Sequence, residues 1–148
     1  MEILLFVFIA YGMLSVLAGQ QVGWLASANH PFLALGVGFF LMGVEHFVNW
    51  RGYDLIMQDW IPAKPTIIRI SATLRVIGGI GLMIPSWHTG SAHLALVLYL
   101  VVLPVNCRVA FAGDRIEGFE MPAWRRWSRL ALHMGWLASA FWCCRIGG

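Results

Sequence analysis

The chain is dominated by long apolar runs that short polar segments separate. A helix needs about 20 apolar residues to cross the hydrocarbon core of a bilayer. Five runs meet or approach this length and contain few polar residues. The pattern predicts an all-α membrane protein, with residues 1–148 forming a single transmembrane domain whose spans lie at about 3–26, 32–50, 65–84, 92–112 and 127–144. The last span is the weakest, because Arg129 lies in its first turns and is expected to extend toward the lipid headgroups.

The segment 51–64 between the second and third runs has a mixed character. Asp54 and Asp59 are interspersed with large apolar side chains. Such a segment is too polar to cross a bilayer and too apolar to stay in water, so an interfacial helix lying flat on the membrane surface is predicted. Pro62 and Pro65 are expected to end this helix and admit the next span.

Composition supports a membrane protein and excludes a soluble domain. The chain is 59% hydrophobic and only 11% charged, whereas soluble domains contain about 25% charged residues. Its mean hydropathy is +0.74. The basic residues lie beside apolar runs and not on one accessible face, so no nucleic-acid partner is expected. The expected partners are the lipid bilayer and other membrane subunits.

The basic residues predict an orientation. Five spans place one group on the N-terminal side of the membrane and leave only Arg145 on the other side. The positive-inside rule then puts the N-terminus in the cytoplasm of a bacterial-type inner membrane. A cleavable signal peptide is the alternative for the first run, but Glu2 and the lack of Lys or Arg before it oppose that. The first group comprises Arg51, Lys64, Arg108, Arg115, Arg125 and Arg126.

Several polar residues fall within the apolar spans: Glu45, His46, Arg75, Asn106 and His133. Ionisable groups in hydrocarbon are costly, so they usually face the bundle interior with a partner. A rise of 1.5 Å per residue places Glu45 about 8 Å, Arg75 about 15 Å and Asn106 about 9 Å from the cytoplasmic ends of their helices. Since a long arginine side chain spans this difference, one cluster centred on a Glu45–Arg75 ion pair is predicted.

Three interpretations of this cluster remain open. It could be a structural ion pair that locks helices together, a pocket for a quinone-like or lipid headgroup, or a haem site. We expect no haem, because ligation by His46 and His133 needs both imidazoles at one cavity and at matched depth. We expect no stand-alone enzyme, since no nucleophile–base pair, metal-ligand set or nucleotide motif is present.

Glycines are concentrated on the second and third spans. Small residues let membrane helices approach closely without a hydrophobic driving force. We therefore expect these positions to mark helix–helix contacts and not chemistry; they are Gly36, Gly38, Gly43, Gly78, Gly79 and Gly81.

Short motifs in the same region resemble those of the DoxX-like membrane proteins. The sequence GVEHF at 43–47 resembles the GxxHF motif of that family. Further similarities, in the same order over residues 36–136, are WIP at 60–62, ISATLR at 70–75 with GGIGL at 78–82, PVN at 104–106 and RLALH at 129–133.

The resemblance implies a four-helix core, here preceded by an extra span. DoxX-like proteins are often labelled as quinone-linked oxidoreductase subunits, or as membrane partners of oxidative-stress and sulfur-oxidation enzymes. This chain departs from the pattern, because Arg75 replaces an acidic residue, Glu45 adds a carboxylate and His133 replaces a glutamine.

The expected function is therefore a small membrane subunit or anchor of a redox-associated complex. A quinone or lipid headgroup would bind near Glu45, His46, Arg75, Asn106 and His133. The alternative is a structural or assembly subunit without a cofactor.

Overall fold

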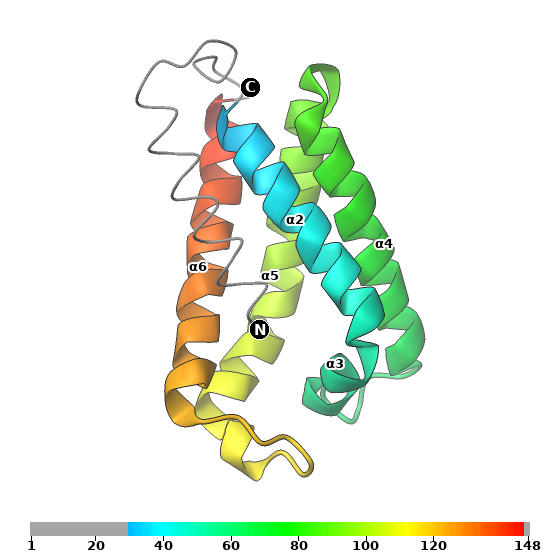
Figure 1. Ribbon diagram of the computed structural model, residues 1–148, viewed down its shortest axis with the longest axis vertical. Coiled ribbons are helices and arrows are strands. Elements are labelled where there is room, and N and C mark those ends of the chain that lie inside the picture. The colour runs from blue at the N-terminus through cyan, green and yellow to red at the C-terminus, as the bar shows by residue number, and fades with distance from the viewer. Residues whose placement is uncertain (1–29, 147–148) are drawn as a thin grey trace.

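The computed structural model describes residues 30–146, and every regular element in that range is a helix. Four long helices lie along the long axis of the molecule (Figure 1). They are α2 (His30–Val48), α4 (Lys64–Met83), α5 (His88–Ala112) and α6 (Ala123–Ile146). The shorter elements are α3 (Trp50–Ile56) and the 3₁₀ turns η2 (Pro85–Trp87) and η3 (Gly113–Arg115). The all-α class is confirmed, while the predicted span 3–26 lies outside the described residues.

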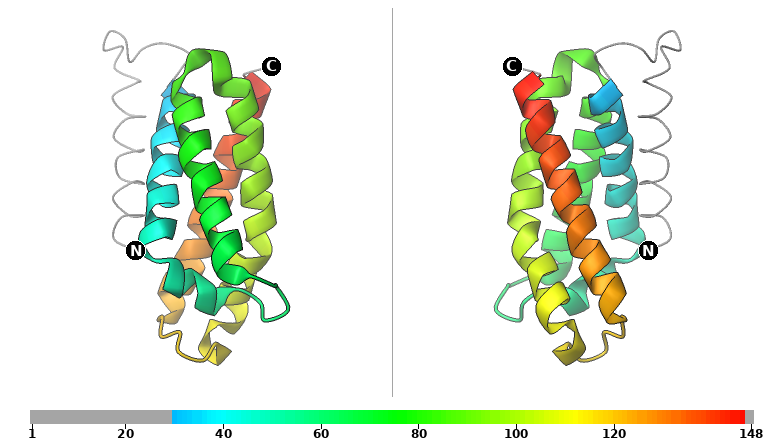
Figure 2. Two further views of the ribbon diagram at one scale, coloured as in Figure 1. Left: turned by 90° about the vertical axis from the view of Figure 1, so that its right-hand side faces the viewer. Right: turned by 90° about the vertical axis from the view of Figure 1, so that its left-hand side faces the viewer.

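The long helices alternate in direction, so the bundle has two distinct ends. Helix α3 and the connection through η3 to α6 lie at one end, and η2 lies at the other (Figure 2). Helix α4 packs most extensively against α2, and α5 packs against α6. The arrangement brings side chains from all four long helices toward one interior.

Three helical segments are long and apolar enough to cross a membrane: Pro31–Val48, Lys64–Met83 and Pro85–Arg115. They identify the chain as a membrane protein. Helix α6 is 24 residues long but is not among them. Its arginines explain the difference, because charged side chains lower its mean hydropathy; they are Arg125, Arg126, Arg129 and Arg145.

The interfacial segment is only partly helical. Helix α2 ends at Val48, and α3 then occupies just seven residues before a non-helical stretch leads to Ala63. Helix α4 begins at Lys64 with Pro65 in its first turn, where the missing amide of proline costs no helical hydrogen bond. The predicted start of the next helix at Pro65 is therefore confirmed, but the prediction that the prolines end the preceding helix is wrong, because α3 ends at Ile56 and residues 57–63 form a loop.

The glycines lie at close helix contacts, as predicted. A Cβ atom on Gly79 would lie 2.6 Å from the backbone nitrogen of Phe40. One on Gly43 would lie 2.9 Å from the carbonyl oxygen of Ala72. Helices α2 and α4 therefore touch backbone to backbone, and no larger residue fits between them. Close contacts also surround Gly36, Gly38, Gly78 and Gly81.

The interior is apolar toward the η2 end and polar toward the α3 end. Leu35, Phe39, Leu82 and Tyr99 are fully buried in the main core cluster. The outward face of α4 exposes large aliphatic residues, including Ile70, Ile77 and Ile80. Lipid tails are the natural neighbours of such a face.

Candidate functional site

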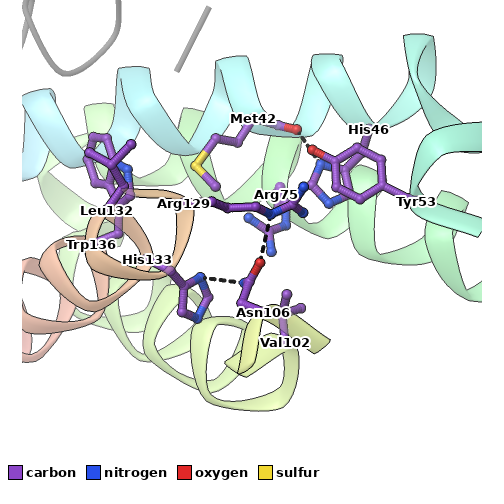
Figure 3. A pocket seen from close by; sticks show the side chains of 10 residues that line it. All are labelled: Met42, His46, Tyr53, Arg75, Val102, Asn106, Arg129, Leu132, His133 and Trp136. Carbon is purple, nitrogen blue, oxygen red and sulfur yellow. Dashed lines mark hydrogen bonds between the residues drawn. The ribbon is translucent and has the colours of Figure 1, made fainter. Parts of the chain in front are cut away.

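A small cavity inside the bundle collects most of the predicted polar residues. Its volume is about 30 Å³, enough for about two water-sized groups. Its walls come from α2, α3, α4, α5 and α6 (Figure 3). The lining residues are Met42, His46, Tyr53, Arg75, Val102, Asn106, Arg129, Leu132, His133 and Trp136. The structure thus brings together His46, Arg75, Asn106 and His133, four of the five predicted positions.

Arg75 is the most unusual residue of this cavity. Its side chain is only 1% exposed, and its guanidinium carbon lies 5.5 Å from the ring centroids of both Phe39 and Tyr99. Cation–π attraction to two rings stabilises the charge in part. Its Nε and Nη1 atoms are nevertheless buried and have no hydrogen-bond partner. Because arginine stays protonated in proteins, Arg75 places an incompletely paired positive charge inside the bundle.

The predicted Glu45–Arg75 ion pair is wrong. Glu45 instead accepts a hydrogen bond at Oε2 from the Tyr53 hydroxyl, at 3.1 Å. Within residues 30–146, the salt bridges are Lys64–Asp59, Arg108–Asp59 and Arg126–Asp114. The prediction used only depth along each helix, whereas contact also depends on the direction of the side chain around the helix axis. Helix α3 folds back toward α2, so the hydroxyl of Tyr53, and not Arg75, contacts the Glu45 carboxylate. Glu45 does not line the cavity.

Tyr53 is a functional candidate that the sequence analysis did not identify. It lies in α3, the short segment that was assigned to the membrane surface. Burial is the largest cause that raises the pKa of Tyr53 above its ordinary value. The phenol therefore keeps its proton and acts as the donor to Glu45.

Asn106 and His133 form the centre of a hydrogen-bonded chain between α5 and α6. His133 Nε2 donates to the carbonyl oxygen of Tyr99 at 2.8 Å. Its Nδ1 must then be the acceptor, and it receives the amide of Asn106 at 3.0 Å. The Asn106 oxygen accepts in turn from Nε of Arg129 at 2.9 Å. Both ring nitrogens of His133 are occupied, so neither is free to ligate a haem iron.

Arg129 faces the interior, contrary to the expectation that it extends to the headgroups. Besides the bond to Asn106, its guanidinium carbon lies 5.4 Å from the ring centroid of Tyr53. The sequence did contain a signal for this position. Residues 129 and 133 are four apart on α6, and side chains four apart share one helix face. The buried His133 therefore implies an inward direction for Arg129.

His46 has one ring nitrogen without a protein partner. Its Nδ1 donates to the carbonyl oxygen of Met42 at 2.7 Å, and its ring stacks on Tyr53 with centroids 3.7 Å apart. This bond fixes the tautomer of a neutral ring and leaves the lone pair on Nε2. Throughout the described part of the chain, no residue hydrogen-bonds to Nε2 of His46.

A larger apolar groove of about 630 Å³ adjoins the small cavity. Isoleucine, leucine and valine side chains of α4 and α5 form its sides, and α3 with the following loop forms its floor. Four residues line both spaces, namely His46, Tyr53, Val102 and Arg129. The volume lies in the range of about 300–1,000 Å³ that is typical of ligand pockets.

Basic residues hold the floor of this groove in place. Nη1 of Arg108 donates to the carbonyl oxygens of Met57 at 2.7 Å and Ile56 at 3.3 Å. Nζ of Lys64 contacts Asp59 at 3.0 Å, and this hydrogen bond holds the pKa of the Asp59 carboxyl below its usual range. Cations at the C-terminal end of α3 also suit the negative end of its helix dipole.

Replacement of Asn106 tests the hydrogen-bonded chain. Asn106→Leu is expected to lower the free energy of unfolding by about 1–2 kcal/mol, because it leaves Nδ1 of His133 and Nε of Arg129 without their partners. The measurement is thermal or denaturant unfolding in detergent. The isosteric change Asn106→Asp keeps an acceptor for Arg129 and should cost less. Equal losses for both variants would contradict the proposed bonding.

The chemistry of the site is that of binding. Around the cavity, positive charge and hydrogen-bond donors meet an apolar groove. Among residues 30–146 no group of three or more His, Cys, Asp or Glu side chains is placed to hold a metal ion.

Comparison with known proteins gives one match. A family model described as "Domain of unknown function (DUF8561)" matches residues 35–144. No curated protein and no solved structure matches the chain. The matched range contains every residue that lines the cavity. The resemblance to DoxX-like proteins stays a prediction.

Proposed function

Because the chain belongs to the DUF8561 family, a domain of unknown function, we propose its function from the site itself. The protein is a membrane-embedded binding subunit for an amphiphile that places an oxygen acceptor at the cationic cavity and its apolar tail in the groove. The observation that carries this proposal is Arg75, a buried charge with unpartnered N–H groups in a cavity that adjoins the groove. A ligand acceptor atom in the cavity would offset the positive charge of Arg75, which lines it.

A quinone-like molecule or a lipid supplies such a ligand. Both carry oxygen acceptors on an apolar tail, as the two adjoining spaces require. A role as membrane subunit of a redox-associated complex follows if the resemblance to DoxX-like proteins reflects common function.

The second candidate is a structural subunit without a ligand. The hydrogen-bonded chain from Arg129 through Asn106 to His133 favours a structural subunit. These bonds connect α5 to α6, and this structural role is enough to explain the three residues. The unpartnered atoms of Arg75 favour the ligand instead.

Filling the groove tests the binding function. Leu74 lines the groove, whereas Ile77 lies one turn away on α4 and does not. In detergent, decyl-chain amphiphiles should bind the Leu74→Trp protein at least tenfold more weakly than the unchanged protein. Ile77→Trp adds the same bulk to the lipid-facing side and serves as the control. Unchanged affinity in Leu74→Trp would exclude the groove as the tail site.

We further propose five spans with the N-terminus in the cytoplasm. Helices α2, α4, α5 and α6 would be four of them, and residues 3–26 the first. At the α3 end lie Arg51, Lys64, Arg108, Arg115, Arg125 and Arg126. By the positive-inside rule this is the cytoplasmic end.

Cysteine labelling tests the orientation. Ser86 lies in η2, Glu117 follows η3, and both are exposed. The two elements lie at opposite ends of the bundle (Figure 2). In intact spheroplasts, an impermeant maleimide should label Ser86→Cys but not Glu117→Cys, and permeabilisation should expose the latter. The native cysteines are replaced by alanine in both proteins. Labelling of Glu117→Cys alone would reverse the proposed orientation.

A further inference from the structure

The charges around the small cavity narrow the class of ligand, given that the proposed binding function holds. Arg75 and Arg129 both line the cavity, and no Asp or Glu does so. The nearest candidate carboxylate, Glu45, is bonded to Tyr53 and is not part of the wall. The hydrogen bonds of His133 describe a neutral ring, because one nitrogen donates and the other accepts. Two positive charges therefore line a space that no carboxylate lines, and Glu45 interacts with the charge of Arg75 without forming an ion pair. A buried charge without a paired counter-charge is costly.

We propose that the headgroup bound here is a carboxylate, and that the site takes a long-chain alkyl carboxylate from the bilayer. A carboxylate would offset one of the two positive charges, which a neutral quinone cannot do. Arginine presents N–H donors in a planar fork that matches the two oxygens of a carboxylate. Two of the three guanidinium nitrogens of Arg75, Nε and Nη1, have no hydrogen-bond partner, so the group is not already engaged by the protein at these atoms.

The size of the cavity supports the same headgroup. About 30 Å³ accommodates about two water-sized groups, and the two oxygens of a carboxylate are of that size. A quinone ring and a phosphodiester lipid headgroup are both larger than this space. They would have to remain in the groove, away from the enclosed charge.

The groove can receive an apolar tail that leads away from Arg75. Ser71 lies one turn before Arg75 on the same face of α4 and lines the groove, and its Oγ is also buried without a partner. Unpartnered polar atoms at positions 71 and 75 thus follow one helix face from the groove to the cavity. A carboxylate at Arg75 would leave its alkyl chain to pass Ser71 and lie along Leu74 and the other aliphatic side chains.

The test uses the full chain purified in a non-ionic detergent and freed of bound lipid. Binding of hexadecanoate, methyl hexadecanoate, hexadecyl phosphate and a decyl quinone is measured by calorimetry. A ¹³C label on the carboxyl carbon of hexadecanoate gives a second readout by NMR. Hexadecanoate should bind at least tenfold more tightly than its methyl ester, which has the same tail but no charge. Its bound carboxyl should also titrate at a lower pH than in detergent alone, because two guanidinium groups favour the anion.

Variants at Arg75 connect this binding to the cavity. Arg75→Met keeps similar bulk and should weaken hexadecanoate binding at least tenfold, while Arg75→Lys keeps the charge and should weaken it less. Arg69→Met, which removes an exposed arginine of the same helix, should have no effect. Should Arg75→Met fail to fold, Arg75→Gln removes the charge and keeps a polar side chain, and it should weaken hexadecanoate binding without weakening that of the methyl ester.

Each other result overturns the inference in a distinct way. Equal binding of hexadecanoate and its methyl ester would show that charge is not recognised. Tighter binding of hexadecyl phosphate would assign the site to a phosphate monoester. Binding of the quinone without the carboxylate would leave the proposed function intact and remove this inference, whereas binding of none of the four would remove both.

Discussion

The variant Gly79→Val should lower the free energy of unfolding by about 3 kcal/mol or more, the upper end of what overpacking usually costs. A Cβ at Gly79 meets the nitrogen and Cα of Phe40 at 2.6 and 2.8 Å and the carbonyl oxygen of Gly36 at 2.8 Å. All three are backbone atoms, which cannot rotate away as a flexible side chain can. The helices α2 and α4 would have to separate, and the interior between them would lose its contacts.

The matched control is Gly90→Val on α5, where a Cβ would meet nothing within 4 Å. This change should alter stability by no more than a few tenths of a kcal/mol, since glycine and valine differ little in helix propensity. Unfolding is followed by circular dichroism in detergent for both proteins. Similar losses at the two sites would contradict the backbone contact between α2 and α4.

The variant Arg75→Met should raise the stability of the lipid-free protein by about 2–4 kcal/mol. It removes a buried charge and two buried N–H groups that lack partners, and replacement of buried ionic groups by apolar ones of similar volume is often stabilising. If Arg75 formed an ion pair with Glu45, Arg75→Met would instead lower the stability, because loss of one partner of a buried pair usually costs about 3–5 kcal/mol. Thermal unfolding of Arg75→Met beside Arg69→Met decides between the two.

Added ligand should stabilise the unchanged protein more than the Arg75→Met variant. A ligand that binds only the folded state stabilises it in proportion to the logarithm of its concentration over Kd. The unchanged protein should therefore gain stability when hexadecanoate is added, while Arg75→Met should gain much less. A loss of stability in lipid-free Arg75→Met would show that Arg75 has a structural role that its contacts do not reveal.

Part of the site was predictable and part was not. The cost of charge in hydrocarbon and the depth of each residue along its helix predicted one cluster of His46, Arg75, Asn106 and His133, and all four line the cavity. The partner of Glu45 was not predictable, because the position of α3 decides it. Tyr53, which donates to Glu45, lies in a segment for which the sequence predicted only a position at the membrane surface.

The sequence by itself determined the elements of this protein. The length of an apolar run relative to the bilayer thickness identifies a spanning helix. The small size of glycine marks a close helix contact, and the missing amide of proline marks a helix boundary. They therefore predicted the four long helices between residues 30 and 146 and the close contacts at Gly43 and Gly79.

Only the tertiary structure decided how the polar residues pair and what they leave unpaired. The rotation of each helix about its axis depends on the packing of all its neighbours, which no short segment encodes. Because of that packing, Arg129 points inward and donates to Asn106, and Glu45 accepts a hydrogen bond from Tyr53. It also left Arg75 as a buried charge without an ion pair, beside an apolar groove.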